Sequence, residues 1–159
     1  SMAHPKKETT LVLFKPDALQ RGLLGEIIHR FERKGLKVTG LKMIQLDDSV
    51  IDDHYGHKKD KPFFHSVKKF MKATPVVALA LSGINAISVV RLLIGPTKGH
   101  EAPAGTIRGD VSMSLQSNVV HASESKETAE VELRRFFKKE ELFDYDRPNF
   151  SYIYADEGF

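Results

Sequence analysis

The chain has 159 residues, which is the size of one ordinary domain. Its apolar fraction of 41% and charged fraction of 28% are typical of a globular protein and exclude an intrinsically disordered chain. No cysteine is present, which excludes a disulfide scaffold, a thiol nucleophile and Cys-ligated metal sites. The net charge of +3 is spread along the chain, so it suits a small polyanion at least as well as a nucleic acid.

The first residues of the sequence predict a disordered end rather than a structural element. Ser1 ahead of Met2 indicates a cloning remnant, and we expect residues 1–8 to be disordered and residues 9–159 to form a single domain. This end lacks the apolar core of a signal peptide. The longest apolar-rich stretch, residues 75–81, is too short to cross a bilayer. These patterns predict a cytoplasmic protein without a membrane partner.

In the first third of the chain, the apolar pattern predicts a strand, a helix and a second strand. Residues 9–15 are β-branched and apolar, as in a strand. The apolar residues that follow have helical spacing up to Gly35, which stands where a C-cap glycine belongs. The second strand, residues 36–46, changes its apolar phase near Gly40, and this change indicates a bulge.

The middle of the chain predicts two short helices and the most apolar strand. The stretch Asp47-Asp48-Ser49 can cap a short helix that runs toward Tyr55, and Pro62 opens another helix. Residues 74–81 are almost entirely apolar, so we expect them to form a central strand. Asn85 then caps a further helix that ends at Gly95.

The last third begins with a loop over about residues 95–113 that is rich in glycine and proline. A loop of this length in a compact domain is usually functional or disordered. A fourth strand is expected over residues 117–121, and Ser123 or Ser125 caps the last helix. Residues 138–159 are expected to wrap the surface. Taken alone, strands that alternate with helices are typical of a parallel doubly wound sheet.

Common phosphate-binding motifs are missing from the sequence, including the P-loop and G-x-G-x-x-G. A phosphate would then be held by Arg and Lys side chains. Arg91, Thr97, Lys98 and Arg108 lie in or beside the glycine-rich loop. A solvated charge is the simpler interpretation for Arg91. For Arg108, which has glycines on both sides, a phosphate-binding role and a solvated surface charge are equally supported.

Of the seven histidines, His121 has the most suggestive position, because it lies between the end of a strand and the start of a helix. A histidine there can act as a nucleophile, although on local grounds alone a structural histidine is the favoured interpretation. Most of the other histidines, His54 among them, lie among polar or charged residues and are expected at the surface. A metal cluster of His54, His57 and His65 is not favoured, because its spacing fits no standard zinc pattern.

Three further residues have two interpretations each. Lys15, at the end of the first strand, can hold a phosphate, although its position alone favours a solvated charge. Tyr55 and Phe63 flank a basic stretch over residues 58–61, and an aromatic ring there can stack on a base. One of Phe63 and Phe64 is instead expected to be a core residue.

In chain order, these residues resemble one family closely. Residues 118–124, Asn-Val-Val-His-Ala-Ser-Glu, are similar to the N-x-x-H-G-S-[DE] active-site signature of nucleoside diphosphate kinases. The resemblance extends from about residue 9 to residue 154. The other matching stretches are Lys15-Pro16-Asp17, Gln20-Arg21-Gly22-Leu23, Gly25-Glu26-Ile27-Ile28, His54-Tyr55, Lys61-Pro62-Phe63-Phe64, Pro75-Val76-Val77-Ala78 and Gly105-Thr106-Ile107-Arg108-Gly109-Asp110.

The resemblance implies an enzyme that moves the γ-phosphoryl group from a nucleoside triphosphate to a nucleoside diphosphate by a ping-pong mechanism, with little base selectivity. It assigns the phosphohistidine to His121, and support of that histidine to Tyr55, Ser123 and Glu132. The residues that it assigns to the substrate are Lys15, Asn118, Arg91, Thr97 and Arg108 for the ribose hydroxyls and phosphates, and Phe63 and Val67 for the base. The implied cofactor is Mg²⁺, held mainly through the nucleotide phosphates and without a protein metal site.

The resemblance also implies a ferredoxin-like βαββαβ fold, which is an α+β fold with a four-stranded antiparallel sheet and helices on its faces. Family members are mostly hexamers or tetramers, and we expect a homo-hexamer. Nucleic acid is not expected as the main partner. The alternative is a catalytically weak family member that acts as a nucleic-acid- or protein-binding module.

Three departures from the family pattern bear on these expectations. Ala122 stands where a glycine is usual, and the alanine methyl is harmless unless the backbone needs a positive φ. Gln116-Ser117 replaces Gly-Arg, which can alter the wall of the site. Lys98-Gly99 replaces Asn-Pro in a loop that helps trimer contacts in hexameric members, so it bears on oligomer stability.

Overall fold

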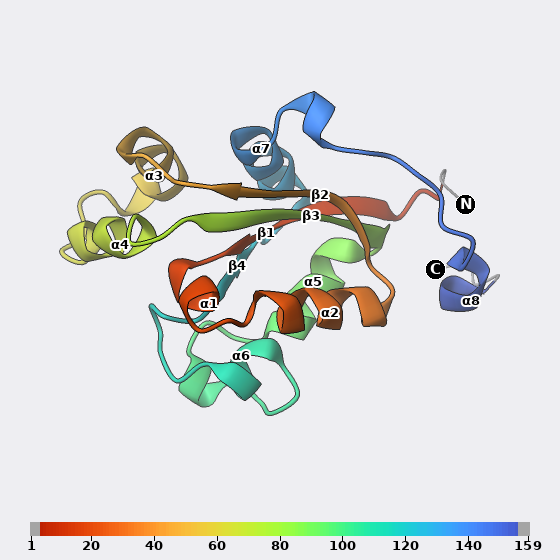
Figure 1. The fold of residues 1–159 in the computed structure, drawn as a ribbon, viewed down its shortest axis with the longest axis horizontal. Helices are drawn as coiled ribbons and strands as arrows, with labels where there is room; N and C mark the ends of the chain where they lie inside the picture. The colour runs from red at the N-terminus through yellow and green to blue at the C-terminus, as the bar shows by residue number, and fades with distance from the viewer. Residues whose placement is uncertain (1–3, 156–159) are drawn as a thin grey trace.

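The computed structural model describes residues 4–155 and has a four-stranded sheet at its centre (Figure 1). The strands are β1 (Lys7–Phe14), β2 (Lys37–Ile44), β3 (Val76–Ile84) and β4 (Val120–Ala122), in the spatial order β2-β3-β1-β4. Every neighbouring pair is antiparallel. This order confirms the ferredoxin-like fold and corrects the parallel sheet that alternation alone favours. The crossover from β1 to β2 passes over β3, and the crossover from β3 to β4 passes over β1. The two strands that each crossover joins are parallel to each other, and the strand between them is antiparallel to both.

All four strands have bounds that differ from the predicted ranges, including β2 and β3, which were expected over residues 36–46 and 74–81. β1 begins at Lys7 rather than at residue 9, because Lys7 and Glu8 pair with Ile84 and Gly83 of β3. These two residues therefore belong to the sheet and not to a disordered end; residues 1–3 and 156–159 lie outside the described part of the chain. β4 has three residues instead of the predicted five, because Val119 has a φ of 66° that no strand accommodates.

Helices cover both faces of the sheet. On one face lie α1 (Pro16–Gln20), α2 (Leu24–Lys34), α5 (Ala86–Ile94) and α6 (Ile107–Val111), and on the other lie α3 (Asp48–Tyr55), α4 (Phe64–Met71) and α7 (Lys126–Phe136). The inner strand β1 contributes to both cores, since successive side chains of a strand point to opposite faces. Val12 and Phe14 pack on the first face, and Leu11 and Leu13 pack on the second.

Local signals fixed most helix ends as predicted. Gly35 follows α2 with a φ of 118°, and Asp47 caps α3 by accepting from the backbone N–H of Val50 at 2.9 Å. Of the two candidates for α7, Ser125 is the cap. The prediction for Asn85 was wrong in one respect. Its side chain makes no capping hydrogen bond to α5, and the carboxylate of Glu8 accepts from a first-turn N–H instead.

The remaining helices are short. They are the 3-10 turns η1 (Gly56–Lys58), η2 (Gly99–Glu101) and η3 (Lys139–Glu141), and α8 (Phe150–Tyr154) near the C-terminus. The predicted bulge in β2 is present between Val38 and Gly40. α4 begins at Phe64 rather than at Pro62. The glycine-rich loop is not irregular throughout, because η2 and α6 lie within it.

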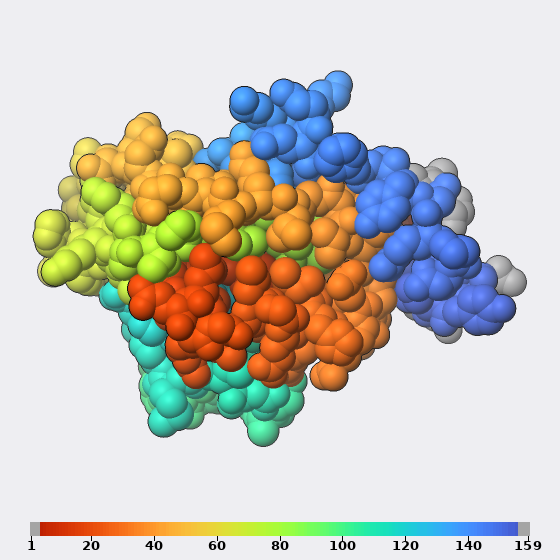
Figure 2. Space-filling model, in the orientation of Figure 1, coloured from red at the N-terminus to blue at the C-terminus, as the bar shows by residue number. Residues whose placement is uncertain are grey.

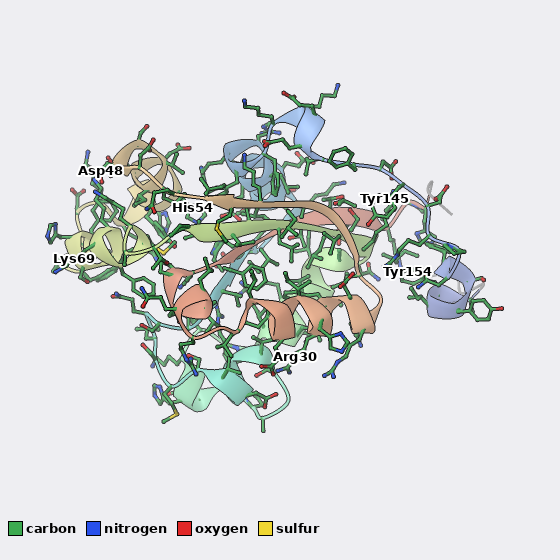
Figure 3. The ribbon with its side chains drawn as sticks, viewed as in Figure 1. Arg30, Asp48, His54, Lys69, Tyr145 and Tyr154 are labelled. Atoms are coloured by element: carbon green, nitrogen blue, oxygen red, sulfur yellow. The ribbon has the colours of Figure 1, made fainter. Side chains whose placement is uncertain are left out.

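The segment after α7 runs along the surface, as Figure 2 shows at the top and right of that view. It is fixed to β2 and β3 at several points. The backbone N–H of Phe143 donates to the carbonyl of Thr39 at 2.8 Å, and the Tyr145 hydroxyl donates to the carbonyl of Val38. The hydroxyl of Tyr154 in α8 accepts from the N–H of Ile84 (Figure 3). Among residues 4–155, no helix has the length and apolar character needed to span a membrane.

Candidate active site

His121 is the middle residue of β4, where it pairs with Leu13 of β1 and faces α7. Its Nε2 lies 3.0 and 2.9 Å from the two carboxylate oxygens of Glu132. An ionised carboxylate can only accept hydrogen bonds, so Nε2 donates and carries the proton. The lone pair of the neutral imidazole is therefore on Nδ1. Within residues 4–155, no group hydrogen-bonds to Nδ1, which leaves it available to a substrate.

Glu132 is buried in α7 and is held by two donors. The hydroxyl of Ser123 donates to Oε1 at 2.6 Å, and His121 supplies the second donor. Burial alone raises the pKa of Glu132, but the hydrogen bonds from His121 and Ser123 outweigh it, and the net pKa is lower than usual. Glu132 is therefore ionised at neutral pH, as its role as the acceptor requires.

His54 is a member of this cluster that the sequence analysis missed. We expected it at the surface, yet it is buried, and its ring lies 4.7 Å from the His121 ring in an edge-to-face arrangement. Figure 3 marks it where α3 meets the sheet. Burial and then the nearby His121 lower the pKa of His54 to about 3. The spacing of Ile51, His54 and Tyr55 on one helix face was the available signal, because this i, i+3, i+4 pattern is that of buried residues.

Tyr55 is also buried, at the end of α3. Its ring packs edge-to-face on His54 at 4.6 Å, and the Lys58 ammonium lies 5.9 Å from its centroid. Burial, then the charge of Glu132, raises the pKa of its hydroxyl well above the ordinary value. Tyr55 therefore stays protonated at neutral pH. Its ring contacts the ring of His54, which in turn contacts the ring of His121.

On the other side of His121, three predicted residues form a chain of hydrogen bonds. The Lys15 ammonium, at the end of β1, donates to the Asn118 Oδ1 at 2.6 Å. The Asn118 amide donates in turn to the carbonyl of Thr97 at 2.9 Å. Burial, followed by the charge of Arg108, lowers the pKa of Lys15 to about 8, and Asp17 partly offsets this. An anion bound there would favour the charged form.

Arg108, the second residue of α6, is buried, and its guanidinium points at backbone carbonyls. It donates to Asn118 at 3.2 Å, to Gly95 at 3.1 Å and to Val120 at 2.6 Å. These contacts fasten the glycine-rich loop to β4. Arg91 of α5 is less tightly held, with one long hydrogen bond of 3.4 Å to the carbonyl of Ala122. Both arginines are thus brought to the strand that carries His121.

A strained turn joins Asn118 to His121. Val119 has a φ of 66°, and the Val120 N–H donates to the Asn118 carbonyl at 2.8 Å, as in a γ-turn. A positive φ is unfavourable for a β-branched residue. The turn is held by the segment that follows β1, where the Lys15 N–H donates to the Val119 carbonyl and Asp17 of α1 accepts from the Val119 N–H. Backbone strain of this kind persists where surrounding contacts fix it.

Phe63 and Val67 lie at the start of α4, one helical turn apart. The Phe63 ring is 47% exposed, whereas Phe64 is buried in the core below it. Of the two phenylalanines, Phe64 is therefore the core residue, and Phe63 leaves a ring face open. Nearby, Gln116 lies 3.5 Å from the Ser66 hydroxyl and accepts from Lys15 through its carbonyl. Gln116 thus forms part of the wall between α4 and Lys15.

Comparison with known proteins gives one consistent result. A family model described as nucleoside diphosphate kinase matches residues 8–142. A nucleoside diphosphate kinase of Parabacteroides distasonis is 53% identical over 152 residues, which cover 96% of this chain and 99% of the relative. One from Staphylothermus marinus is 55% identical over 138 residues, covering 87% and 98%. This chain belongs to the nucleoside diphosphate kinase family.

Solved structures of the family agree with this assignment. A Halobacterium salinarum nucleoside diphosphate kinase in complex with CDP superposes with a TM-score of 0.90 at 41% identity, covering 93% of this chain and 99% of that one. A Borrelia burgdorferi nucleoside-diphosphate kinase, solved as a transition state mimic with vanadate and ADP, has a TM-score of 0.86 at 34% identity, covering 94% and 98%. The chain is a phosphotransferase that moves the γ-phosphoryl group of a nucleoside triphosphate to a nucleoside diphosphate, and the binding-module alternative is not favoured.

For this nucleoside diphosphate kinase, the alanine after the histidine is compatible with the fold. Ala122 lies in β4, pairs with Val12 and is 1% exposed. Its φ is not among the positive values found in residues 4–155. The usual glycine is therefore not required here by backbone conformation, as the sequence analysis expected.

The side chains around His121 do not form a cage for Mg²⁺. His54, His121 and Glu132 bring two imidazoles and one carboxylate within 4.8 Å of one another. Mg²⁺ prefers oxygen ligands in an octahedral arrangement, so this nitrogen-rich group does not suit it. The guanidinium of Arg135 also lies 2.8 Å from the Nδ1 of His54 and occupies that nitrogen. We assign no metal ion to this cluster.

Proposed function

We propose that this nucleoside diphosphate kinase works by a ping-pong mechanism through a phosphohistidine on Nδ1 of His121. The observation that carries the proposal is the pairing of His121 Nε2 with Glu132, which leaves the lone pair on Nδ1. That lone pair attacks the γ-phosphorus, the bond to the bridging oxygen breaks, and the nucleoside diphosphate leaves with the bond electrons. A second diphosphate then attacks the phosphohistidine through a terminal oxygen, and His121 regains its lone pair.

Glu132 and Ser123 act as the support for His121 in this proposal. Phosphorylation of Nδ1 places positive charge on a ring whose Nε2 keeps its proton, and the adjacent carboxylate stabilises that charge. Ser123 fixes the carboxylate through its 2.6 Å hydrogen bond. Tyr55 supports the pair indirectly, since its ring holds His54 against His121.

The residues on the other side of His121 bind the substrate. Lys15 and Asn118 bind the ribose hydroxyls and phosphates, and Arg91, Thr97 and Arg108 bind the phosphates. Phosphoryl transfer depends mainly on position and on neutralised charge, which these cations supply without a P-loop. The base stacks on the open face of Phe63 beside Val67, and stacking accepts any base.

Mg²⁺ is the proposed cofactor, and it is brought in by the nucleotide. When bound to phosphate oxygens, the ion neutralises charge there and orients the phosphates. The cations Lys15, Arg91 and Arg108 face the same phosphates from the protein. They suit a substrate that carries its own metal better than they suit a protein-held ion.

Self-association into a homo-hexamer is also proposed. β2 is an outer strand of the sheet, and it exposes Leu41 and Met43 at 55% and 63%. The segment after α7 covers β2 near Val38 and Thr39, and the exposed apolar side chains farther along the strand favour pairing with another chain. Light scattering on the purified protein measures the mass, and a monomer would contradict the proposal. The cytoplasmic location remains a prediction.

The test of the mechanism is to incubate the purified protein with γ-labelled ATP and Mg²⁺ and to look for a labelled protein. A phosphohistidine is labile to acid and stable to alkali, and a nucleoside diphosphate should release the label as triphosphate. His121→Ala should abolish labelling, whereas His57→Ala, on the exposed turn η1, should not. Labelling that persists in His121→Ala would contradict the proposal.

A further inference from the structure

Arg135 connects α7 to the end of α3 at a point that the proposed mechanism does not use. Its Nε donates to Asp53 Oδ2 at 2.7 Å, and its Nη1 lies 2.8 Å from the Nδ1 of His54. The side chain of Arg135 is 14% exposed and His54 is buried, so their contact is sheltered from water, whereas Asp53 lies at the surface. Asp53 and His54 are consecutive residues, and one planar guanidinium binds both of them. The guanidinium is therefore fixed in orientation by two partners.

The contact with Arg135 determines which nitrogen of His54 carries the proton. A guanidinium has only donors and stays protonated in proteins. The Nδ1 of His54 must therefore accept, which requires a lone pair on that nitrogen. His54 is then a neutral imidazole with its proton on Nε2.

The alternative protonation state of His54 would disturb the active site. Its Nδ1 lies 3.7 Å from Glu132 Oε2, the oxygen that is 2.9 Å from His121. With a proton on Nδ1, His54 would be a donor next to that carboxylate, and a small rotation would complete a hydrogen bond. His121 and His54 would then compete for Glu132. The titratable and charged groups that face His54 are Asp53, Tyr55 and His57 from α3 and η1, His121 from β4, and Glu132 and Arg135 from α7.

We infer that Arg135 is a positioning residue for phosphoryl transfer. By donating to the Nδ1 of His54, it keeps that histidine from donating to Glu132 and leaves both carboxylate oxygens to His121 and Ser123. The inference rests on the proposed role of His121 as the nucleophile. Arg135 acts through two other side chains and needs no contact with the nucleotide.

The first test uses Arg135→Met, which removes the donor and keeps a long side chain. Its matched control is Arg134→Met, on the exposed face of the same helix. Arg135→Lys is the conservative variant, because an ammonium can still donate to Nδ1. In single-turnover labelling with γ-labelled ATP, Arg135→Met should phosphorylate His121 about tenfold more slowly, which is the effect of one weakened hydrogen bond. Arg134→Met should match the wild type, and Arg135→Lys should recover most of the rate.

The loss should deepen as the pH falls, because His54 without Arg135 gains a proton more readily. A loss that is the same at every pH would show that Nδ1 gains its proton by a change of tautomer alone, whereas a loss that shrinks as the pH falls would overturn the inference. The second measurement is ¹⁵N NMR of the imidazole nitrogens. Wild-type His54 should have an unprotonated Nδ1, and Arg135→Met should gain a proton there. A protonated Nδ1 in the wild type would also overturn the inference, whether or not His121 is the nucleophile.

The decisive comparison places Arg135→Met and its control Arg134→Met in a His54→Phe background. Phenylalanine keeps an aromatic ring in the cluster with Tyr55 and Phe136 but has no donor for Glu132. If Arg135 acts through His54, Arg135→Met should cause no further slowing in this background. An equal tenfold slowing with and without His54 would refute the inference. A wild-type protein that forms no phosphohistidine would instead contradict the proposed function, while NMR would still report the state of His54.

Discussion

The two sides of His121 are built differently. On the Nε2 side, the polar groups have partners within the chain: His121 and Ser123 donate to Glu132, and Arg135 donates to His54. On the Lys15 side, three cations, Lys15, Arg91 and Arg108, gather near one another, and Lys15 and Arg108 both have lowered pKa values because of burial first and neighbouring positive charge second.

This difference indicates which part of the site is completed only when a substrate binds. The Nε2 side is complete without nucleotide, and it sets the proton position on the nucleophile. On the Lys15 side, Asp17 offsets only part of the positive charge, and the phosphates of a nucleotide supply the rest. Changes on the Nε2 side should therefore slow transfer while nucleotide affinity is kept. Changes on the Lys15 side should weaken nucleotide binding as well.

The largest effect is expected from Arg108→Met, compared with Arg91→Met. Arg108 satisfies the carbonyls of Gly95, Asn118 and Val120, and its loss leaves buried acceptors unpaired. We expect its free energy of unfolding to fall by about 2–4 kcal/mol and kcat/KM to fall more than about 100-fold. In Arg91→Met, kcat/KM should fall by a similar factor. Its free energy of unfolding should fall by less than about 1 kcal/mol, because Arg91 makes one long hydrogen bond.

Urea unfolding and steady-state kinetics on both variants measure these quantities. Equal stability losses in Arg91→Met and Arg108→Met would show that the carbonyl contacts of Arg108 do not hold the loop. Unchanged kcat/KM in either variant would remove that arginine from the phosphate-binding set.

Much of the fold was predictable from local patterns, because these patterns record local causes. Gly35 ends α2, Asp47 caps α3, and the phase shift near Gly40 marks the bulge in β2. Strand order was not predictable in this way, because it depends on contacts between distant segments. Periodicity favoured a parallel sheet, and only the family resemblance gave the antiparallel order.

The site was predictable where a residue matched the family signature, and less so where geometry alone decides. Lys15, Asn118, Thr97 and Arg108 are brought together as expected. The positive φ of Val119 left no signal in the sequence, because nothing in a valine predicts a strained turn. His54 was misplaced because its polar neighbours in the chain suggest a surface, whereas helix packing buries it against His121.

Glu132→Gln tests the Nε2 side of the comparison. The amide oxygen can still accept from His121, but the negative charge that stabilises the phosphorylated ring is lost. We expect phosphorylation of His121 to slow roughly 10- to 100-fold, with ADP affinity within about twofold of the wild type because Glu132 lies away from the cations. Single-turnover labelling and calorimetric titration with ADP measure the two quantities. A large loss of ADP affinity would show that the two sides are not separable.

The smallest effect is a pH dependence that belongs to the Lys15 side alone. The pKa of Lys15 is lowered to about 8, so the free enzyme loses this charge as the pH rises through about 8. Since kcat/KM reports the free enzyme, it should fall about tenfold for each pH unit above that value. Bound phosphates favour the ammonium form, so kcat should begin to fall only at higher pH. In Lys15→Met the descending limb should disappear, and in Glu132→Gln it should remain, because the low pKa of Glu132 keeps it ionised throughout this range. If the pH at which kcat/KM begins to fall changes in Glu132→Gln, the titrating group would be His121 or one of its partners instead of Lys15.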